Sequence, residues 1–473
     1  MADNLDPNVL KLIPKKFKGL KVIIERYNKE VIDITGNITE ISLYETIYTP
    51  FIYGELILVD NSAMLSTFPF IGQERVLIIW QRADKVINKF FRVTDVFNVN
   101  QVNESTGGYG LSITSDKQVR NAFSLFSKSY KGNSAEIIEK IYKEFLLEDL
   151  DVRAKGYLSH NVVFPYIKPL AAINMIQRAT PAEDKTPMFV YDTLYGEKPV
   201  LNSMKNMLEQ DPVLVIDPKN TVASSSKEIS SQNVDRFKNQ AYAVTINRAY
   251  NTLDQMSDGA YASQTLSVDI SKRSFTATDF DFQLHAPSIG KDWITTFFTF
   301  DDVPKADNPN DVLVNGIRST KLRLQYQNEK AYEDYPNLNT IDENLIAGMR
   351  SYMKRLKSTS VNVYMNSVPE LEAGKTVDLK YYRFSPKLNN EDVDDKVNSG
   401  KYLIAALRHY VKNGEYTMSL ELVRDGIGED AELYVNGNPP NFGNPPRVRK
   451  SLLFDFENKT VNQNITGDLF DNE

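Results

Sequence analysis

The side chains best suited to acid–base or metal chemistry are few in this chain and lie far apart. Its three histidines are His160, His285 and His409, and none has a second histidine at the spacing that places two metal ligands on one helix face. The chain has no cysteine, which excludes a disulfide framework and any thiolate metal site. No GxSxG, Walker lysine loop or HExxH motif occurs. We therefore predict no catalytic, cofactor-binding or metal-binding residue, and we interpret His409 as a structural polar residue at the rim of a β-barrel.

Three further segments invite a chemical interpretation. The acidic run Glu391–Asp395 offers carboxylate oxygens to a hard cation, but clustered like charges usually face water, so we predict a solvated loop. We interpret the segment 425–430 as a turn that ends a strand. The cluster Gly107–Gly110 joins two strands, which favours a hairpin turn over a phosphate cradle. A carboxylate pair of the glycosidase type stays open, because 62 acidic residues give many pairs whose separation the sequence does not show.

Composition bounds the class of protein. The 473 residues are too many for one core and indicate about three domains. A formal charge of −7 argues against a broad basic footprint for nucleic acid. The longest apolar run, Tyr402–Leu407, is too short to span a membrane, and no apolar stretch follows the first lysines as in a secretory signal. We expect a soluble protein that folds in a reducing compartment and has no membrane anchor.

Two distant stretches look like one β-domain written twice. Both contain a turn glycine before an alternating strand, an aromatic-led strand, and a hairpin into a Tyr-led strand. Including a Tyr-led opening strand, the matched segments are 51–60, 71–80, 89–96 and 109–114 in one copy and 259–269, 372–382, 401–407 and 416–425 in the other. Four matches in the same order indicate a true duplication. It predicts that Gly72 and Gly374 occupy equivalent tight turns with positive φ.

The segment between the two copies shows a helical period. Asn133 is placed to cap a helix with Glu136 three residues later, and Pro169 suits the first position of a second helix. Residues 188–192 and 213–217 are typical of buried strands, with a helix over 202–210 between them.

These patterns predict an α+β, predominantly β protein. It has two similar small β-barrel tube-type domains, an α+β domain between them, and an insertion in the second barrel. The expected boundaries are an N-terminal arm at 1–17, a first barrel at 18–118, a middle domain and linker at 119–238, a second barrel at 239–270 and 356–430, an insertion at 271–355, and an extended C-terminal tail at 431–473.

The tail is rich in Asn, Pro and Gly and cannot build a core of its own. It nevertheless carries a short apolar cluster, which we expect to be an interface with a neighbouring subunit or a partner protein. The cluster consists of Leu452, Leu453, Phe454 and Phe456.

The second copy carries a more specific pattern. The run Gly400-Lys401-Tyr402-Leu403-Ile404, the pair Arg408-His409, and the strand Tyr416–Asp425 resemble the baseplate hub proteins of contractile-tailed bacteriophages. Relatives of those hubs occur in phage late-control proteins and in type VI secretion spike proteins. Residues 188–211 weakly resemble the segment between the two barrels of that family.

The resemblance implies a homotrimer whose six barrels form a short tube between a sixfold tail tube and a threefold central spike. Implied partners are the tail tube protein, the spike protein, and also tape-measure and baseplate wedge proteins. Genomic DNA would pass through without sequence-specific binding, which the net negative charge suits. No spike domain follows the second copy, so the spike is expected on another chain. The expected location is the virion tail baseplate, after synthesis in the host cytoplasm.

Two alternatives stay open at this point. One is a virion-associated cell-wall-degrading enzyme, which an assay of cell-wall hydrolysis would reveal. The other is the hub of a phage-like contractile injection system.

Overall fold

The computed structural model describes residues 19–218, 241–281, 313–327, 343–424, 454–455 and 460–461, apart from short gaps inside these ranges. The chain divides into one unit over residues 1–429 and a second over 430–473. The N-terminal arm, the linker at 219–238, His285 and most of the acidic run 391–395 lie outside the described residues. Strands predominate, and the predicted class, predominantly β with an α+β middle, is confirmed.

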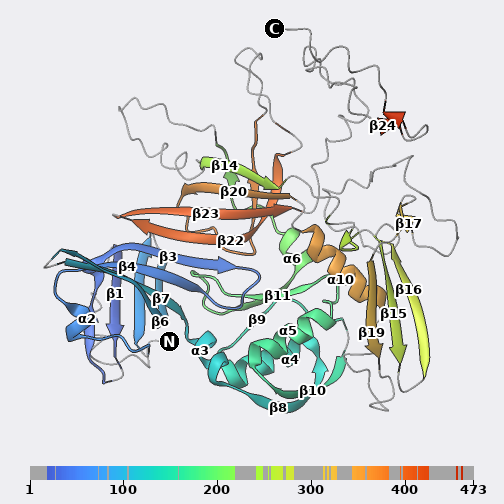
Figure 1. Ribbon diagram of the computed structural model, residues 1–473, viewed down its shortest axis with the longest axis horizontal. Coiled ribbons are helices and arrows are strands. Elements are labelled where there is room, and N and C mark those ends of the chain that lie inside the picture. Colours follow the sequence, from blue (N-terminus) through green and yellow to red (C-terminus); the bar gives the residue numbers. More distant parts are fainter. Residues whose placement is uncertain are drawn as a thin grey trace, which may run out of the picture. The chain divides into compact units, whose positions relative to one another are not determined.

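One 13-stranded sheet runs through the first unit (Figure 1). Its main path is β14-β20-β23-β22-β3-β4-β7-β6-β5-β1-β2, and β21 and β13 continue from β22. The strand bounds are β1 Gly19–Glu25, β2 Val31–Asp33, β3 Ile38–Thr46, β4 Tyr53–Asp60, β5 Arg75–Arg82, β6 Lys85–Asn103, β7 Thr106–Ser115, β13 Val215–Ile216, β14 Ala241–Arg248, β20 Thr359–Asn366, β21 Thr376–Leu379, β22 Gly400–Lys412 and β23 Glu415–Arg424. Two short helical turns, η2 Thr35–Asn37 and α2 Met64–Thr67, connect strands of the first part.

Between the two parts of the sheet the chain forms the predicted α+β region. Its elements are α3 Asp116–Phe123, β8 Phe126–Asn133, α4 Ser134–Ile141, the π-helical turn η3 Tyr142–Leu146, β9 Asp151–Val152, β10 Ser159–Ile167, α5 Pro169–Ala179, β11 Met188–Tyr191, β12 Val200–Ser203 and α6 Met204–Leu208. β8 pairs with β10, and β9, β12 and β11 form a second small sheet. Helices α4 and α5 bury Ile138, Ile141 and Ile173 in the core of this region.

Both helix starts follow the local signals. The Asn133 side chain accepts a hydrogen bond from the Ala135 amide at 3.0 Å and caps α4, although Glu136 takes no part in that bond. Pro169 occupies the first turn of α5, where its missing N–H leaves no hydrogen bond unmade. The strand β12 falls where the sequence indicated a helix from residue 202, and α6 begins only at Met204.

A separate three-stranded sheet follows β14. It consists of β15 Ala262–Asp269 and β16 Ser274–Asp281, which are antiparallel, and β19 Lys321–Gln327, which is parallel to β15, and it lies beside α10 Glu343–Arg355. The short strands β17 Leu313–Val314 and β18 Ile317–Arg318 pair with each other. Residues 262–269, assigned from their sequence to the second barrel, therefore pair with strands of the insertion instead. Alternation in β15 fits either sheet, because a two-residue period fixes a buried face but not a neighbour.

In the second unit the structure describes one short antiparallel pair. β24 Phe454–Asp455 pairs with β25 Thr460–Val461, with Phe454 opposite Val461. Phe454 thus lies in a short strand within the segment expected to be extended. Leu452, Leu453 and Phe456 lie outside the described residues, and the interface role of the four stays a prediction.

Candidate functional site

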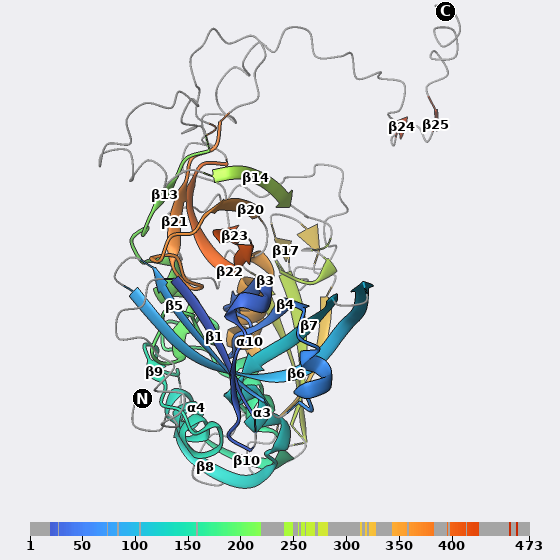
Figure 2. The same ribbon diagram turned by 90° about the vertical axis from the view of Figure 1, so that its left-hand side faces the viewer.

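The two parts of the large sheet repeat one strand order. The first copy runs β3-β4-β7-β6-β5-β1, and the second copy runs β14-β20-β23-β22-β21-β13. Neighbours are antiparallel throughout both series, except that β13 is parallel to β21 whereas β1 is antiparallel to β5. Figure 2 shows β13 beside β21 in the second copy. The internal repeat predicted from the sequence is thus confirmed in topology.

The register of the two copies also matches. Opposed residues follow the series Val93–Ile113–Gly54–Leu43 in the first copy and Ile404–Leu422–Val361–Ile246 in the second. A β-bulge follows Val93 and another follows Ile404 at the equivalent place. The counterpart of β4 is therefore β20, residues 359–366. The equivalence of 51–60 with 259–269 was wrong, because the insertion separates β14 from its true neighbour in sequence.

The turn glycines behave as predicted. Gly72 has φ +83° and Gly374 has φ +82°, and each lies just before the counterpart strands β5 and β21. A Cβ at Gly72 would meet nothing within 4 Å, whereas one at Gly374 would lie 2.5 Å from the Tyr191 hydroxyl oxygen. The two turns share a backbone conformation but differ in surroundings.

The Gly107–Gly110 cluster forms no hairpin turn. All four residues lie in β7 and pair with β4, and the three glycines also pair with β6. A Cβ at Gly110 would lie 2.3 Å from the Phe97 ring on β6, so glycine is needed there because the aromatic side chain lies across the strand.

The copies join through β22 and β3 (Figure 1). These strands are antiparallel from Ala406 opposite Thr46 to Lys412 opposite Glu40. Arg408 Nη2 donates to Ser42 Oγ at 2.7 Å, and the Tyr410 hydroxyl donates to Glu40 Oε2 at 3.0 Å. A ladder of backbone hydrogen bonds, rather than a flexible linker, therefore connects the copies.

A buried polar network crosses this junction. His409 Nε2 lies 2.7 Å from Glu45 Oε1, and His409 Nδ1 lies 2.6 Å from the Tyr416 hydroxyl, both within hydrogen-bond distance. The Glu45 oxygens also accept from the Leu194 amide at 2.6 Å and the Ala373 amide at 3.2 Å. One carboxylate thus ties the first copy to the second and to the middle region.

His409 does not lie at the rim of a barrel, which corrects the expectation from the sequence. Its side chain and that of Glu45 have no exposed surface. β22 continues beyond its own copy to pair with β3 of the first copy, and Glu45 of β3 lies against the buried imidazole.

A second buried cluster fastens α3 to the rest of the middle region. Lys117 Nζ lies 2.7 Å from Asp192 Oδ2 and 2.8 Å from Glu148 Oε2. Burial alone would lower the pKa of Lys117, but the two carboxylates outweigh burial and hold that pKa above its ordinary value. Burial would raise the pKa of Asp192, yet Lys117 and Lys89 hold it below the ordinary value. The pair stays ionised and cross-links the fold.

The remaining chemical candidates do not converge. His160 is 2% exposed, neither ring nitrogen has a hydrogen-bond partner among the described residues, and burial lowers its pKa to about 4. Within the described ranges, no group of three His, Cys, Asp or Glu side chains is placed to hold a metal ion. No helix in that part of the chain is long and apolar enough to cross a membrane.

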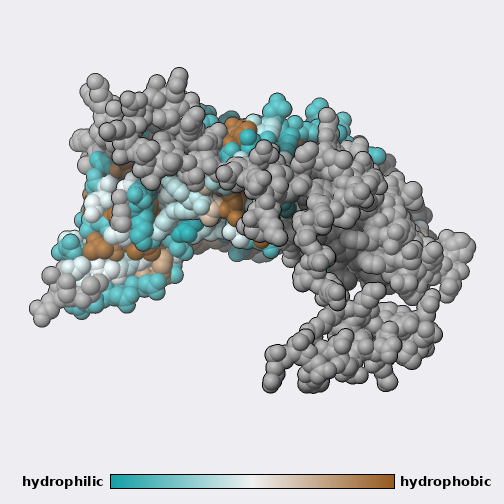
Figure 3. All heavy atoms as spheres, turned by 90° about the horizontal axis from the view of Figure 1, so that it is seen from above, coloured by the Kyte–Doolittle hydropathy of each residue, from teal (hydrophilic) through white to brown (hydrophobic). Residues whose placement is uncertain are grey.

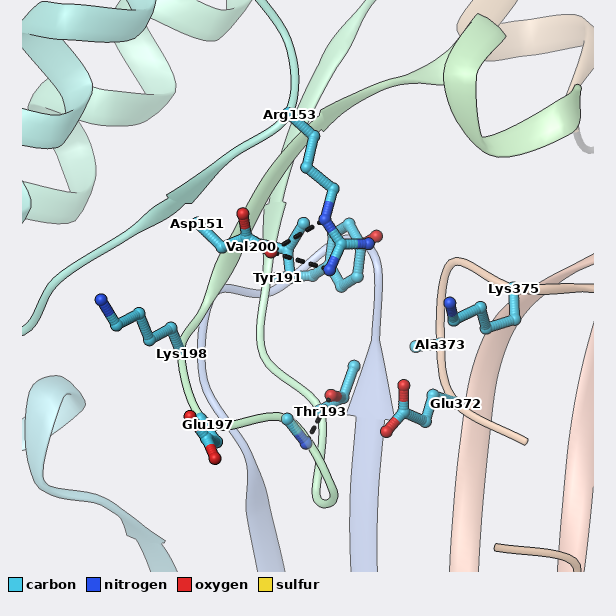
Figure 4. A pocket seen from close by; sticks show the side chains of 11 residues that line it. Asp151, Arg153, Tyr191, Thr193, Glu197, Lys198, Val200, Glu372, Ala373 and Lys375 are labelled. Atoms are coloured by element: carbon cyan, nitrogen blue, oxygen red, sulfur yellow. Dashed lines mark hydrogen bonds and ion pairs between the residues drawn. The ribbon is translucent and has the colours of Figure 1, made fainter. Parts of the chain in front are cut away.

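One pocket lies between the β11–β12 loop and the turn of Gly374 (Figure 4). Arg153 points into it and pairs with Asp151 at 2.7 Å. Acidic and basic side chains are balanced around it, namely Asp151, Glu197, Glu372, Arg153, Lys198 and Lys375. Such a lining gives no net attraction for an ion of either sign, and we assign it no ligand.

Two strands of the repeat, β6 and β14, each have an edge without a described neighbouring strand. From Val93 onward β6 pairs with β7, and among the described residues no strand lies on its other side. β14 pairs with β20, and no described strand lies beyond it. Val99 on β6 is 60% exposed and Tyr242 on β14 is 53% exposed. In Figure 3 the described face seen from above shows separate hydrophobic patches among polar residues.

Comparisons with known proteins give low similarity. No family model matches the sequence, and no curated protein matches it. The tail protein from Neisseria meningitidis MC58 is 9% identical with a TM-score of 0.49, covering 87% of this chain and 98% of its own. The 43 kDa tail protein of prophage MuSo2 from Shewanella oneidensis is 9% identical with a TM-score of 0.47, covering 86% and 98%.

A third solved structure is the E. coli c3393 protein, described as a type VI secretion component with structural similarity to the T4 tail proteins gp27 and gp5. It is 7% identical with a TM-score of 0.43, covering 82% of this chain and 73% of its own. The structural neighbours are thus phage tail proteins and a type VI secretion component. These TM-scores lie below 0.5, so the neighbours carry no argument about function, and the internal repeat is the feature from which function is inferred.

Proposed function

We propose that this protein is a structural hub subunit of a contractile-tail baseplate. It assembles as a homotrimer whose six similar units form a short tube between a sixfold tail tube and a threefold central spike. The observation that carries the proposal is the repeat, in which one chain holds two copies with the same strand order and register. A trimer of duplicated units presents sixfold-like contacts to one partner while keeping threefold symmetry for another.

The connection between the copies fits a mechanical role. The copies share a hydrogen-bonded sheet at β22–β3, and the Glu45–His409 pair is buried within that junction. A rigid junction holds the two units of one chain at a fixed angle, which a tube requires. The net charge of −7 supports a conduit through which DNA passes without being held.

The proposed partners are the tail tube protein and the spike protein, with tape-measure and baseplate wedge proteins as neighbours in the particle. The proposed location is the tail of a virion, and the hub of a phage-like injection particle is the alternative setting. The two settings make the same demand on the subunit, so the repeat does not favour one over the other.

We further propose that the chain has no enzymatic activity. The His409 side chain is enclosed, and the His160 side chain is only 2% exposed. The test is a cell-wall hydrolysis assay on the purified full-length chain and on His409→Ala. We expect no turnover in either, and a lower melting temperature for the variant. Turnover that disappears in His409→Ala would instead establish the cell-wall-degrading enzyme.

The trimer is tested by native mass measurement of the full-length chain, alone and with a spike protein from the same particle. Three copies are expected, with electron-microscopy class averages that show six similar lobes around one axis. A true hexamer, or a monomer that persists with the spike protein present, would overturn the hub proposal.

A further inference from the structure

The repeat leaves two strand edges without described neighbours, and they are counterparts of the strands joined at the junction. Within the chain β22 pairs with β3. The counterpart of β22 is β6, and the counterpart of β3 is β14. The two edges are that of β6 beyond Val93 and the outer edge of β14. Each copy therefore offers one half of a junction that the described residues complete once, at β22 and β3.

Side-chain burial shows the same incompleteness. On β3, which pairs with β22 along one edge, Ile41 and Leu43 are 0% exposed. Their counterparts on β14 are Val244 and Ile246, which are only partly buried at the margin of the second core. Likewise Leu407 on β22 is 2% exposed. Its counterpart on β6, Val96, is partly buried at the margin of the first core.

We propose that β6 of one subunit pairs with β14 of the next subunit, antiparallel, as a copy of the β22–β3 junction. The occupant of each free edge is thus a second copy of this chain. Backbone groups along the edges would gain hydrogen bonds, and Val96, Val244 and Ile246 would gain the cover that their counterparts have. The contact is head-to-tail, so it leads to a closed ring or to a filament. The number of subunits in the ring rests on the proposed hub function, whereas the strand pairing does not.

The repeat also gives the register of this contact. Tyr410 lies opposite Ser42 at the internal junction. Asn100 lies opposite Gly108 on β7, and Tyr410 lies opposite Thr417 on β23. Because Gly108 and Thr417 are equivalent positions, Asn100 is the counterpart of Tyr410. Thr245 takes the place of Ser42, because their partners on β20 and β4 are equivalent. β6 has an extra bulge between Phe97 and Asn100, so we transfer the register only beyond that bulge. Asn100 of one subunit should face Thr245 of the next.

The absence of cysteine from the sequence allows a direct test by disulfide formation in the full-length chain. Asn100 and Thr245 are both exposed. Asn100→Cys and Thr245→Cys are made in separate chains, and the two variants are mixed and oxidised. The control replaces Thr245→Cys with Asn362→Cys, which is also exposed and lies directly opposite Thr245 on β20. Asn362 is one strand further from the edge, so two strand spacings place it about 10 Å from residue 100. Disulfides require Cα atoms within about 7 Å.

We expect a covalent two-chain product from the first mixture in large excess over the control. A chain carrying both Asn100→Cys and Thr245→Cys should give a ladder that ends at a circular three-chain species. No disulfide at the first pair, or equal yields in the two mixtures, would overturn the strand pairing. If mass measurement still gives a trimer in that case, the hub proposal stands and only the interface is wrong. A specific disulfide with a closed species of another size would support the interface and overturn the trimer.

Discussion

Replacing the two turn glycines by alanine separates backbone strain from side-chain packing. Gly72 and Gly374 have nearly the same positive φ, +83° and +82°. In this region an L-residue costs about 1–2 kcal/mol relative to glycine. Gly72→Ala adds a methyl group to open space, so its cost should be that strain alone. Gly374→Ala carries the same strain and also places Cβ 2.5–2.9 Å from three atoms of Tyr191.

The extra cost at Gly374 follows from where Tyr191 lies. Its side chain is 3% exposed and packs in the core shared by the middle region and the second copy. Overpacking such a site costs about 1–3 kcal/mol. We therefore expect Gly374→Ala to lower the free energy of unfolding by about 2–5 kcal/mol, against about 1–2 kcal/mol for Gly72→Ala.

The assay is thermal unfolding of the full-length chain, in which 1 kcal/mol corresponds to roughly 2–4 °C for a cooperative unit of about 150–250 residues. Repeating Gly374→Ala in a Tyr191→Leu background should reduce its cost to that of Gly72→Ala, because the clashing ring atoms are gone. Equal costs for the two glycines in the native background would refute the packing argument. A cost at Gly374 that is unchanged by Tyr191→Leu would refute it as well.

Three other changes have defined outcomes. Burial holds the pKa of His160 at about 4, against about 6.5 in the unfolded chain, so on acidification the unfolded chain binds the proton first. The free energy of unfolding should therefore fall by about 3 kcal/mol from pH 6.5 to pH 4. His160→Leu should flatten that slope in urea titrations. Lys117→Met leaves Asp192 buried without its nearest cation, and should cost about 3–5 kcal/mol by urea unfolding, less if Asp192→Asn is added. Deleting residues 447–473 should leave the circular dichroism spectrum of the sheet unchanged but weaken baseplate assembly. Normal assembly of the truncated chain would rule out the interface role of the tail.

Local signals in the sequence predicted local structure well. The cap at Asn133, the proline at 169 and the paired turn glycines depend on backbone chemistry within a few residues, and all appear where expected. The repeat was visible because three successive strands of each copy kept the same order along the chain. The pairing of β22 with β3 was not predictable, because Tyr410 and Ser42 are hundreds of residues apart and nothing in either strand specifies the other.

The same limit explains the misplaced opening strand. β15 alternates as β4 does and carries a similar Val-Asp ending, so periodicity could not distinguish them. What distinguishes them is the sheet that each strand joins, and the long insertion hid the true counterpart, β20. The burial of His409 was missed for a related reason, since the enclosing strand belongs to the other copy.

The connection between the first two strands of the repeat differs greatly between the copies. Residues 47–52 link β3 to β4, whereas residues 249–358 link β14 to β20 and include the β15–β16–β19 sheet and α10. In the proposed ring, every second unit would therefore carry an additional module, and the units between would carry none. A hexamer of single-copy chains could not differ in this way, because each of its subunits has the same sequence. Duplication within one gene thus allows one copy to acquire structure without altering the other, so that a ring of six similar units can bear three identical projections on alternate units.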